Sequence, residues 1–373
     1  MVKLVHVIVS LEIGGAEGML ERLVQESSKN PLIHQSIITL KNEGTIGRRL
    51  RMQGFEVISL SMTSLLSSPI ILYKLIQIFK RRRPDVVYTW MYHADLLGGV
   101  AAFLSGIKRI IWGIRNSKIP QGSFSVTSAI IRICSVLSFY IPTKIVCCAE
   151  SAKAAHVELG FCSSKMVVIP NGYDLDSFNP SSSLRDRIRR DLGLLESHLV
   201  IGVVGRFDPL KDFNNFVEAA SLVSRDLDGV KFLMVGKGLD KDNYELNLWI
   251  EKSQYSTNFL LYGETNPHDL FAAMDVYCLS SKAEGFPNVV AEAMAMRIPC
   301  VVTDVGDAAR IVGESGLVVD PMDANALYKG LMLMLNLDKH ERDVLGNKAR
   351  QLIESRYDLK VVQQKFLALA EKS

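Results

Sequence analysis

The sequence predicts an α/β protein built from two doubly wound parallel sheets. Short runs rich in Val and Ile alternate with amphipathic stretches, the pattern of parallel strands covered by helices on both faces. These runs form two series, separated by a segment at residues 171–183 that is rich in Asn, Pro, Ser and Gly. The length of 373 residues exceeds one hydrophobic core, and about 150 residues per domain give two domains.

The first series predicts seven strands, because β-branched side chains pack well on a pleated sheet. We expect them at residues 4–9, 33–40, 56–60, 85–88, 109–113, 144–148 and 166–169. The second series predicts strands at residues 200–204, 231–235, 259–262, 276–279, 300–303 and 316–319. Each series predicts one Rossmann-like sheet, so the expected domains are residues 1–175 and 176–357.

Two helices in the first half bear on a membrane. Residues 125–141 are apolar and almost long enough to span a bilayer, but Arg132 and seven Ser, Thr, Cys or Tyr positions favour a buried or interfacial helix. Residues 68–83 carry Ile71, Leu72, Leu75, Ile76 and Phe79 on one face and end in Lys80, Arg81, Arg82 and Arg83. This second helix either packs on the sheet or lies on anionic lipid.

Cysteine usage and the amino terminus indicate a cytoplasmic protein. The six cysteines lie mostly in apolar runs, without the spacing of metal ligands, and indicate buried thiols in a reducing compartment. The run before Glu12 is too short and wrongly flanked for a signal peptide, so export is not expected.

The net charge of +3 conceals an asymmetry between the two halves. Residues 1–175 carry 20 Lys and Arg against 11 Asp and Glu, whereas the remainder carries 23 against 29. The basic half is therefore expected to meet an anion. Nucleic acid is disfavoured because no helix-turn-helix, zinc or RNP-type pattern occurs. A membrane surface or a phosphate-linked acceptor fits better.

Two loops carry residues suited to phosphate. Gly14 and Gly15 follow the first strand, so the Gly15 amide can approach a phosphate closely. No GxGxxG pattern occurs there, which argues against a nicotinamide enzyme. Arg206 and Lys211 follow the first strand of the second series, at the sheet edge where α/β proteins bind ligands. Two cations there can hold a diphosphate without a metal, although both could equally be solvated.

The segment Glu284-Gly-Phe-Pro-Asn-Val-Val-Ala-Glu292 places two carboxylates around a loop that turns into a helix. Asn288 is expected to cap a helix at residues 289–296, whose first amides attract phosphate. Glu292 lies one turn into that helix, where it can accept hydrogen bonds from a ribose diol. Glu284 is expected to face the group that is attached to the phosphate. The alternative is a capped surface helix with two solvated acids.

Gly205-Arg206-x4-Lys211 followed by Glu284-x7-Glu292 resembles the family 4 glycosyltransferases (group 1 glycosyltransferases) of the GT-B fold. The resemblance spans nearly the whole chain and includes the first glycine loop, the turn at residues 170–174 and the strand end at Gly263. It implies that a final helix within residues 358–373 crosses back onto the first domain.

The resemblance also implies roles for matching residues. Arg206 and Lys211 would bind the donor diphosphate, Glu292 the ribose and Glu284 the donor sugar, while His93 would lie beside the reacting sugar and act with the two cations and Glu284 in catalysis. The implied donor-binding residues are Gly15, Arg206, Lys211, Gly263, Glu284, Phe286, Pro287, Asn288, Val289 and Glu292. The base would stack near Tyr262. Arg115 and Asn116 either face the acceptor or serve the fold.

The resemblance implies a glycosyltransferase that retains the anomeric configuration, and the two cations predict that it needs no metal and no cofactor. We expect a UDP-linked sugar donor and front-face attack, with the leaving phosphate as the base. The basic half favours a lipid-linked or saccharide acceptor, as in the assembly of bacterial surface polysaccharide or lipopolysaccharide. A peripheral position on the inner face of the plasma membrane would agree with such an acceptor. A soluble acceptor, a nucleotide-sugar epimerase, a nicotinamide oxidoreductase and a non-catalytic sugar-binding protein are the alternatives. The sequence does not specify the donor sugar, the linkage or the oligomeric state.

Overall fold

The computed structural model describes residues 2–116 and 126–370. The chain folds into two compact units. Unit 1 comprises Met1–Tyr173 with Leu359–Ser373, and unit 2 comprises Asp174–Asp358. Each unit is described on its own.

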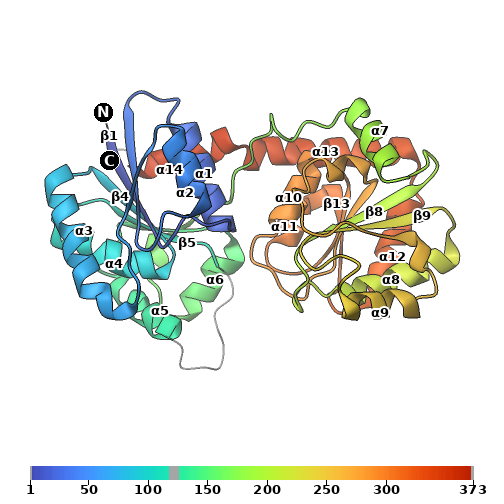
Figure 1. Ribbon diagram of the computed structural model, residues 1–373, viewed down its shortest axis with the longest axis horizontal. Coiled ribbons are helices and arrows are strands. Elements are labelled where there is room, and N and C mark those ends of the chain that lie inside the picture. Colours follow the sequence, from blue (N-terminus) through green and yellow to red (C-terminus); the bar gives the residue numbers. More distant parts are fainter. Residues whose placement is uncertain (1, 117–125, 371–373) are drawn as a thin grey trace. The chain divides into compact units, whose positions relative to one another are not determined.

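Unit 1 is built on a seven-stranded parallel sheet in the order β3-β2-β1-β4-β5-β6-β7 (Figure 1). Its strands are β1 (Val2–Ile8), β2 (Ile33–Thr39), β3 (Glu56–Ser59), β4 (Val86–Trp90), β5 (Ile110–Ile114), β6 (Lys144–Cys147) and β7 (Met166–Val168). The central strands β4 and β5 are buried along their whole length, which explains their continuous apolar sequence.

Helices connect the strands of unit 1 and cover its sheet. They are α1 (Gly15–Ser27), α2 (Gly44–Met52), α3 (Ser68–Arg82), α4 (Tyr92–Leu104), α5 (Val126–Leu137), α6 (Glu150–Glu158) and α14 (Leu359–Ala370). The last helix, α14, lies beside α1 although more than 300 residues separate them in sequence (Figure 1). Val362 and Phe366 of α14 join the core that includes Leu20 and Leu23 of α1.

Unit 2 is built on a six-stranded parallel sheet in the order β10-β9-β8-β11-β12-β13. Its strands are β8 (Leu199–Val204), β9 (Val230–Val235), β10 (Phe259–Leu261), β11 (Val276–Leu279), β12 (Cys300–Thr303) and β13 (Gly316–Val319). Its helices are α7 (Ser182–Asp191), α8 (Phe213–Asp226), α9 (Tyr244–Lys252), α10 (Asn288–Ala295), α11 (Ala308–Val312), α12 (Ala324–Leu335) and α13 (Lys339–Tyr357). Short 3-10 turns occur at Leu65–Ser67, Ser163–Lys165, Ser256–Asn258, Leu270–Ala273 and Gly313–Ser315.

The α/β class with two doubly wound sheets is confirmed, and each expected strand is present within two residues of its expected ends. The helix at residues 68–83 packs against α4 within unit 1, and its Ile71, Leu75 and Phe79 are buried. Its apolar stripe is therefore not free for lipid, and the guanidinium of Arg82 forms an ion pair with Glu56. Among the helices that the structure describes, none has the length and apolarity needed to cross a membrane.

Candidate active site

The carboxyl edge of the unit 2 sheet brings Lys211 and Glu284 together. Lys211 follows β8 and Glu284 follows its neighbour β11, so two adjacent strands deliver both loops to one edge. The Lys211 Nζ lies 2.6 Å from the Glu284 Oε1, with 23% and 14% of the two side chains exposed. Ser281 donates its hydroxyl to the same carboxylate oxygen at 2.6 Å. Glu284 thus accepts two hydrogen bonds, one of them charge-assisted.

Three further contacts hold these two loops in register. The Ser280 hydroxyl donates to the main-chain oxygen of Lys211 at 2.8 Å, and the amide of Lys282 donates to the oxygen of Leu210 at 2.8 Å. The Lys282 Nζ forms an ion pair with the buried Asp212 Oδ1 at 3.1 Å. The Lys211 ammonium is therefore placed by its backbone as well as by Glu284.

Gly306 allows a third loop to pack against Glu284. Its φ of +57° lies in the left-handed region, and a Cβ there would meet the Gly285 oxygen at 2.4 Å and the Glu284 oxygen at 2.6 Å. The amide of Asp307 donates to the Gly285 oxygen at 2.9 Å. A side chain at position 306 would displace the loop that carries Glu284.

Arg206 lies on the rim, separate from the Lys211–Glu284 pair. Its side chain is 74% exposed and donates from Nε to the Asp208 Oδ2 at 3.2 Å. Asp208 also accepts from the amide of Leu210 at 3.0 Å. Arg206 is accordingly a solvated cation that a bound anion can recruit at small cost.

The expectation that Asn288 caps the helix is wrong. Asn288 is the first residue of α10, and Pro287 occupies the cap position with no side-chain hydrogen bond to the helix. Proline fixes φ, which is −73° here, so the loop enters the helix one residue earlier than expected. Phe286 packs edge-on against Tyr357, with ring centroids 5.7 Å apart, and Val289 is half-buried on the first turn.

Glu292 is half-buried on α10, near the Tyr277 ring of β11. Burial raises the pKa of the Tyr277 hydroxyl well above its usual value, and the neighbouring Cys300 and Cys278 and the charges of Glu284 and Glu292 raise it further. The charges of both predicted site carboxylates, Glu284 and Glu292, therefore act on the Tyr277 hydroxyl.

Near Gly263, the loops that follow β8, β9 and β10 contact one another through glycine main-chain atoms. The oxygen of Gly263 accepts from the amide of Gly236 at 2.7 Å, and its amide donates to the Leu239 oxygen at 2.9 Å. A Cβ on Gly236 would meet the Gly205 oxygen at 2.1 Å, so the loops after β8 and β9 touch through their backbones. Tyr262, beside Gly263, is partly exposed.

In unit 1, Gly15 and His93 both follow carboxyl ends of strands. Gly15 is exposed at the first position of α1, after β1. His93 is half-buried in the first turn of α4, after β4. Burial lowers the pKa of His93, and the positive charge of Lys41, after β2, lowers it further. The His93 imidazole is therefore neutral at neutral pH.

The buried Asp95 ties the His93 turn to the sheet. It accepts a hydrogen bond from the Thr89 hydroxyl of β4 at 2.5 Å and interacts with the main chain of Gly113 in β5. Burial raises the pKa of the Asp95 carboxyl to about 8. The residue that leads into this turn, Met91, has a φ of 73°, outside the usual range for a side-chain-bearing residue.

Arg115 serves the fold of unit 1. Its guanidinium lies 4.7 Å from the Trp90 ring centroid and 5.4 Å from that of Phe366 in α14, and it donates to the Asn171 Oδ1 at 3.2 Å. The possibility that Arg115 faces an acceptor is therefore not supported, whereas the neighbouring Asn116 is exposed.

Sequence reasoning missed Lys41, Asp95, Gly236, Ser281 and Gly306. Ser281 and Lys41 are common polar residues that follow strands, and no local pattern distinguishes them. The two glycines could have been noticed from their positions in the sequence. Gly236 directly follows the predicted strand at 231–235, and Gly306 lies three residues after the predicted strand at 300–303. Their close backbone contacts are set by loops distant in sequence.

The chain matches two family models, one over each half. The model of Glycosyltransferase Family 4 matches residues 13–177, and that of Glycosyl transferases group 1 matches residues 185–352. The first range contains strands β2 to β7 of unit 1, and the second contains all six strands of the unit 2 sheet.

Named relatives include two bacterial glycosyltransferases. The capsular polysaccharide biosynthesis glycosyltransferase CapM of Staphylococcus aureus is 22% identical, over 79% of this chain and 78% of CapM. The UDP-Gal:alpha-D-GlcNAc-diphosphoundecaprenol alpha-1,3-galactosyltransferase of Escherichia coli is 24% identical, over 81% and 78% of the two chains.

A solved structure shares the fold. Anabaena Alr3699/HepE in complex with UDP superposes with a TM-score of 0.86 over 98% of both chains at 19% identity. The two family models together span most of the chain, and the two Rossmann-like units match the GT-B architecture. The protein is a glycosyltransferase and belongs to the family 4, group 1 glycosyltransferases.

Proposed function

We propose that this glycosyltransferase moves a sugar from a UDP-linked donor to a lipid-linked saccharide, with retention of anomeric configuration and without a metal ion. The observation that carries the proposal is the Lys211–Glu284 pair at the carboxyl edge of the unit 2 sheet. It joins a cation for phosphate and a carboxylate for sugar hydroxyls at 2.6 Å. Unit 2 would bind the donor, and unit 1 would receive the acceptor.

The donor diphosphate would be held by Lys211, by the exposed rim cation Arg206 and by the first amides of α10. Two positive side chains and a helix amino terminus neutralise a diphosphate and its leaving charge. The ribose diol would donate to Glu292, one turn along α10, and the base would stack near Tyr262 and Gly263. The sugar hydroxyls would donate to Glu284, which Ser281 and Lys211 orient. Gly15 would offer an amide to the distal phosphate.

Front-face attack would account for retention. The bond between the anomeric carbon and the diphosphate oxygen breaks while the acceptor oxygen bonds to the same face of that carbon. The departing phosphate oxygen takes the proton of the acceptor hydroxyl, so the products are a glycoside and UDP. A neutral His93 would accept a hydrogen bond from the reacting sugar or its acceptor.

Relatives support the choice of substrates. The E. coli relative carries a UDP-linked donor and a diphosphoundecaprenol-linked acceptor in its name, and the Anabaena protein was solved with UDP. The name of the S. aureus relative places it in capsular polysaccharide biosynthesis. We therefore extend a UDP donor, a polyprenyl-diphosphate-linked acceptor and a role in surface polysaccharide assembly to this protein.

Unit 1 would bind the membrane surface by electrostatic attraction. Lys80, Arg81 and Arg83 are exposed at the end of α3, whereas the Arg82 charge is paired with Glu56. Exposed cations attract anionic lipid without needing an apolar helix face. The enzyme would then work at the inner face of the plasma membrane, where lipid-linked acceptors are presented.

A thermal-shift panel tests the donor assignment. UDP-, GDP-, ADP- and TDP-sugars are added in turn to the wild-type protein and to the Lys211→Ala variant. A UDP-sugar should raise the wild-type Tm by mass action and raise that of the variant less. A larger shift with another base would overturn the UDP donor, and release of a new sugar nucleotide without acceptor would favour an epimerase.

A further inference from the structure

Unit 2 contains a cavity of about 410 Å³ at the edge of the sheet opposite the Lys211–Glu284 pair. Asp275 and Pro299 line it, and they immediately precede β11 and β12, so the cavity lies at the amino ends of these strands. The donor residues follow the carboxyl ends. The four residues of β11 separate the two sites by roughly 13 Å of strand.

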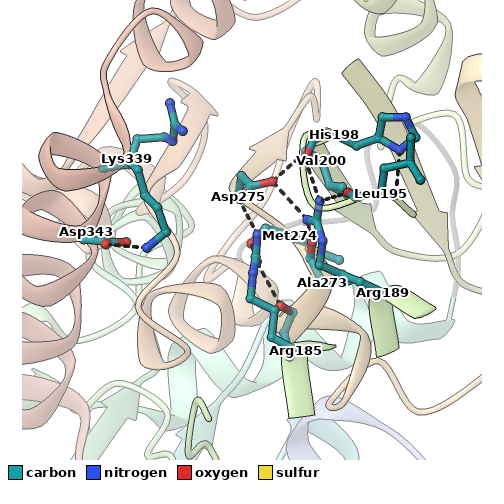
Figure 2. A network of polar contacts seen from close by, with 12 residues as sticks. Arg185, Arg189, Leu195, His198, Val200, Ala273, Met274, Asp275, Lys339 and Asp343 are labelled. Atoms are coloured by element: carbon teal, nitrogen blue, oxygen red, sulfur yellow. Dashed lines mark hydrogen bonds and ion pairs between the residues drawn. The ribbon is translucent and has the colours of Figure 1, made fainter. Parts of the chain in front are cut away.

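Positive charge is in excess in this cavity. Four cations line it, Arg185, Arg297, Lys339 and Arg342, against the two carboxylates Asp275 and Asp343. Figure 2 shows Arg185 and Arg189 converging on Asp275, with Lys339 and Asp343 on the other side. Asp275 accepts from the Arg185 Nη2 at 2.6 Å, from the Arg189 Nη1 at 3.3 Å and from the Val200 amide at 2.8 Å. Two guanidinium groups thus share one carboxylate.

The charges of Arg342 and Arg297 are not balanced by a carboxylate contact within residues 2–116 and 126–370. Arg342 donates to the main-chain oxygens of Leu335 and Leu337, which are neutral acceptors. Arg297 is exposed and has a φ of 61°, a conformation that glycine adopts with less strain. Its main chain packs closely against α13, since a Cβ on Gly346 would meet the Arg297 oxygen at 2.0 Å. The guanidinium of Arg297 therefore extends from a closely packed stretch of main chain.

Two helices begin at the cavity, and the amino terminus of α7 adds to its positive potential. Ser181 caps α7 by accepting from the Leu184 amide at 3.2 Å, and Ser181 and Ser182 both line the cavity. Lys339, the first residue of α13, lines it from the other side. Helix amino termini favour anions, and α7 has 10 residues; the first turn of α13 is already capped by the carboxylates of Asp338 and Glu341.

We propose that this cavity binds a small phosphorylated molecule of sugar-phosphate size, at a site separate from the donor site. A doubly charged phosphate matches the excess of cations, and guanidinium groups bind phosphate oxygens in pairs. The volume suits a small molecule. This site goes beyond the proposed function, and its existence does not depend on the identity of the donor.

Calorimetry with ribose 5-phosphate as the probe tests the proposal on the full chain. The wild-type protein should bind the probe and should not bind ribose, which lacks the phosphate. The variant Arg297→Ala/Lys339→Ala should bind it about ten-fold or more weakly, because two charge-assisted contacts are lost. Both side chains are exposed, so the variant is expected to fold, as a circular dichroism spectrum will verify.

Two comparison variants separate this site from the donor site and from general charge effects. Arg206→Ala/Lys211→Ala should retain wild-type affinity for ribose 5-phosphate. Lys329→Ala/Lys348→Ala removes two exposed cations outside the cavity and should also leave affinity unchanged. No binding by the wild-type protein, or equal affinity in the Arg297→Ala/Lys339→Ala variant, overturns the proposal. Loss of binding in the Arg206→Ala/Lys211→Ala variant would assign the probe to the donor site and also overturn it.

Discussion

The Glu284 carboxylate accepts from the Lys211 ammonium at 2.6 Å and from the Ser281 hydroxyl at 2.6 Å, both on the same oxygen. The two ionic partners are 73 residues apart in sequence. In the proposed function, this arrangement would orient the cation for the phosphate and the carboxylate for the sugar before the donor binds. Preorganised charges of this kind favour transfer because they need not reorganise during the reaction.

Replacing Lys211 with Ala should lower kcat/KM for transfer about ten-fold or more. The change removes a charge-assisted hydrogen bond to the donor, worth about 1.5–3 kcal/mol. Steady-state kinetics on purified protein measures the loss. Lys329→Ala, which removes an exposed cation from α12, is the matched control and should leave the kinetics unchanged. Wild-type kinetics in a folded Lys211→Ala protein would rule out the assigned role.

Replacing Glu284 and replacing Glu292 should have different effects on nucleotide binding. Glu292→Gln should weaken the binding of UDP, since its proposed partner is the ribose. Glu284→Gln should leave UDP affinity near normal and impair transfer, since its proposed partner is the sugar. Calorimetry with UDP and with the intact sugar nucleotide measures both effects. Equal losses of UDP affinity in the two variants would contradict this division.

Activity should survive excess EDTA. In the proposed mechanism Arg206, Lys211 and the amino end of α10 neutralise the diphosphate, which a divalent ion does in other transferases. Product formation is followed with and without the chelator, after prior dialysis against it. Loss of activity that only Mg²⁺ or Mn²⁺ restores would show that the side chains are insufficient.

Asp95 should make the protein less stable as pH rises. Burial raises its folded pKa to about 8 from an ordinary value of 3.8, so the stabilising contribution is full below pH 3.8 and is lost as pH rises through 8. Across the window between these values, the free energy of unfolding should fall by about 1.4 kcal/mol per pH unit relative to Asp95→Asn. Urea unfolding of both proteins at several pH values gives the difference between their free energies of unfolding. Contributions of the other titratable groups cancel in this difference. A flat difference from pH 5 to 8 would mean that Asp95 is ionised in the folded state.

Anionic vesicles should bind the protein at low salt and release it at high salt. Each exposed cation near such a surface contributes about 1 kcal/mol, screened over roughly 8–10 Å at ordinary salt. Changing Lys80, Arg81 and Arg83 to Gln should reduce co-sedimentation, while Arg82 is left intact because it pairs with Glu56. Changing the exposed Lys241, Lys329 and Lys348 of unit 2 is the matched control. If the wild-type protein ignores anionic vesicles at low salt, a soluble acceptor becomes the better hypothesis.

The local sequence determined the strands and the candidate donor residues. β11 and β12 begin and end where their apolar runs do, since a strand buried on both faces needs continuous apolar side chains. Lys211 and Glu284 could be chosen because each follows such a strand, and the carboxyl ends of parallel strands share one edge.

Only the tertiary structure decided which of these groups touch. Arg206 and Lys211 are five residues apart, yet Lys211 contacts Glu284 and Arg206 contacts Asp208. Asn288 has the chemistry of a cap, but the proline before it fixes the backbone and takes that position. The cavity lined by Arg297 and Lys339 carries no local motif, because its residues come from four separate segments of the chain. Periodicity and turn chemistry act over a few residues, whereas ion pairs and cavities depend on which strands and helices become neighbours.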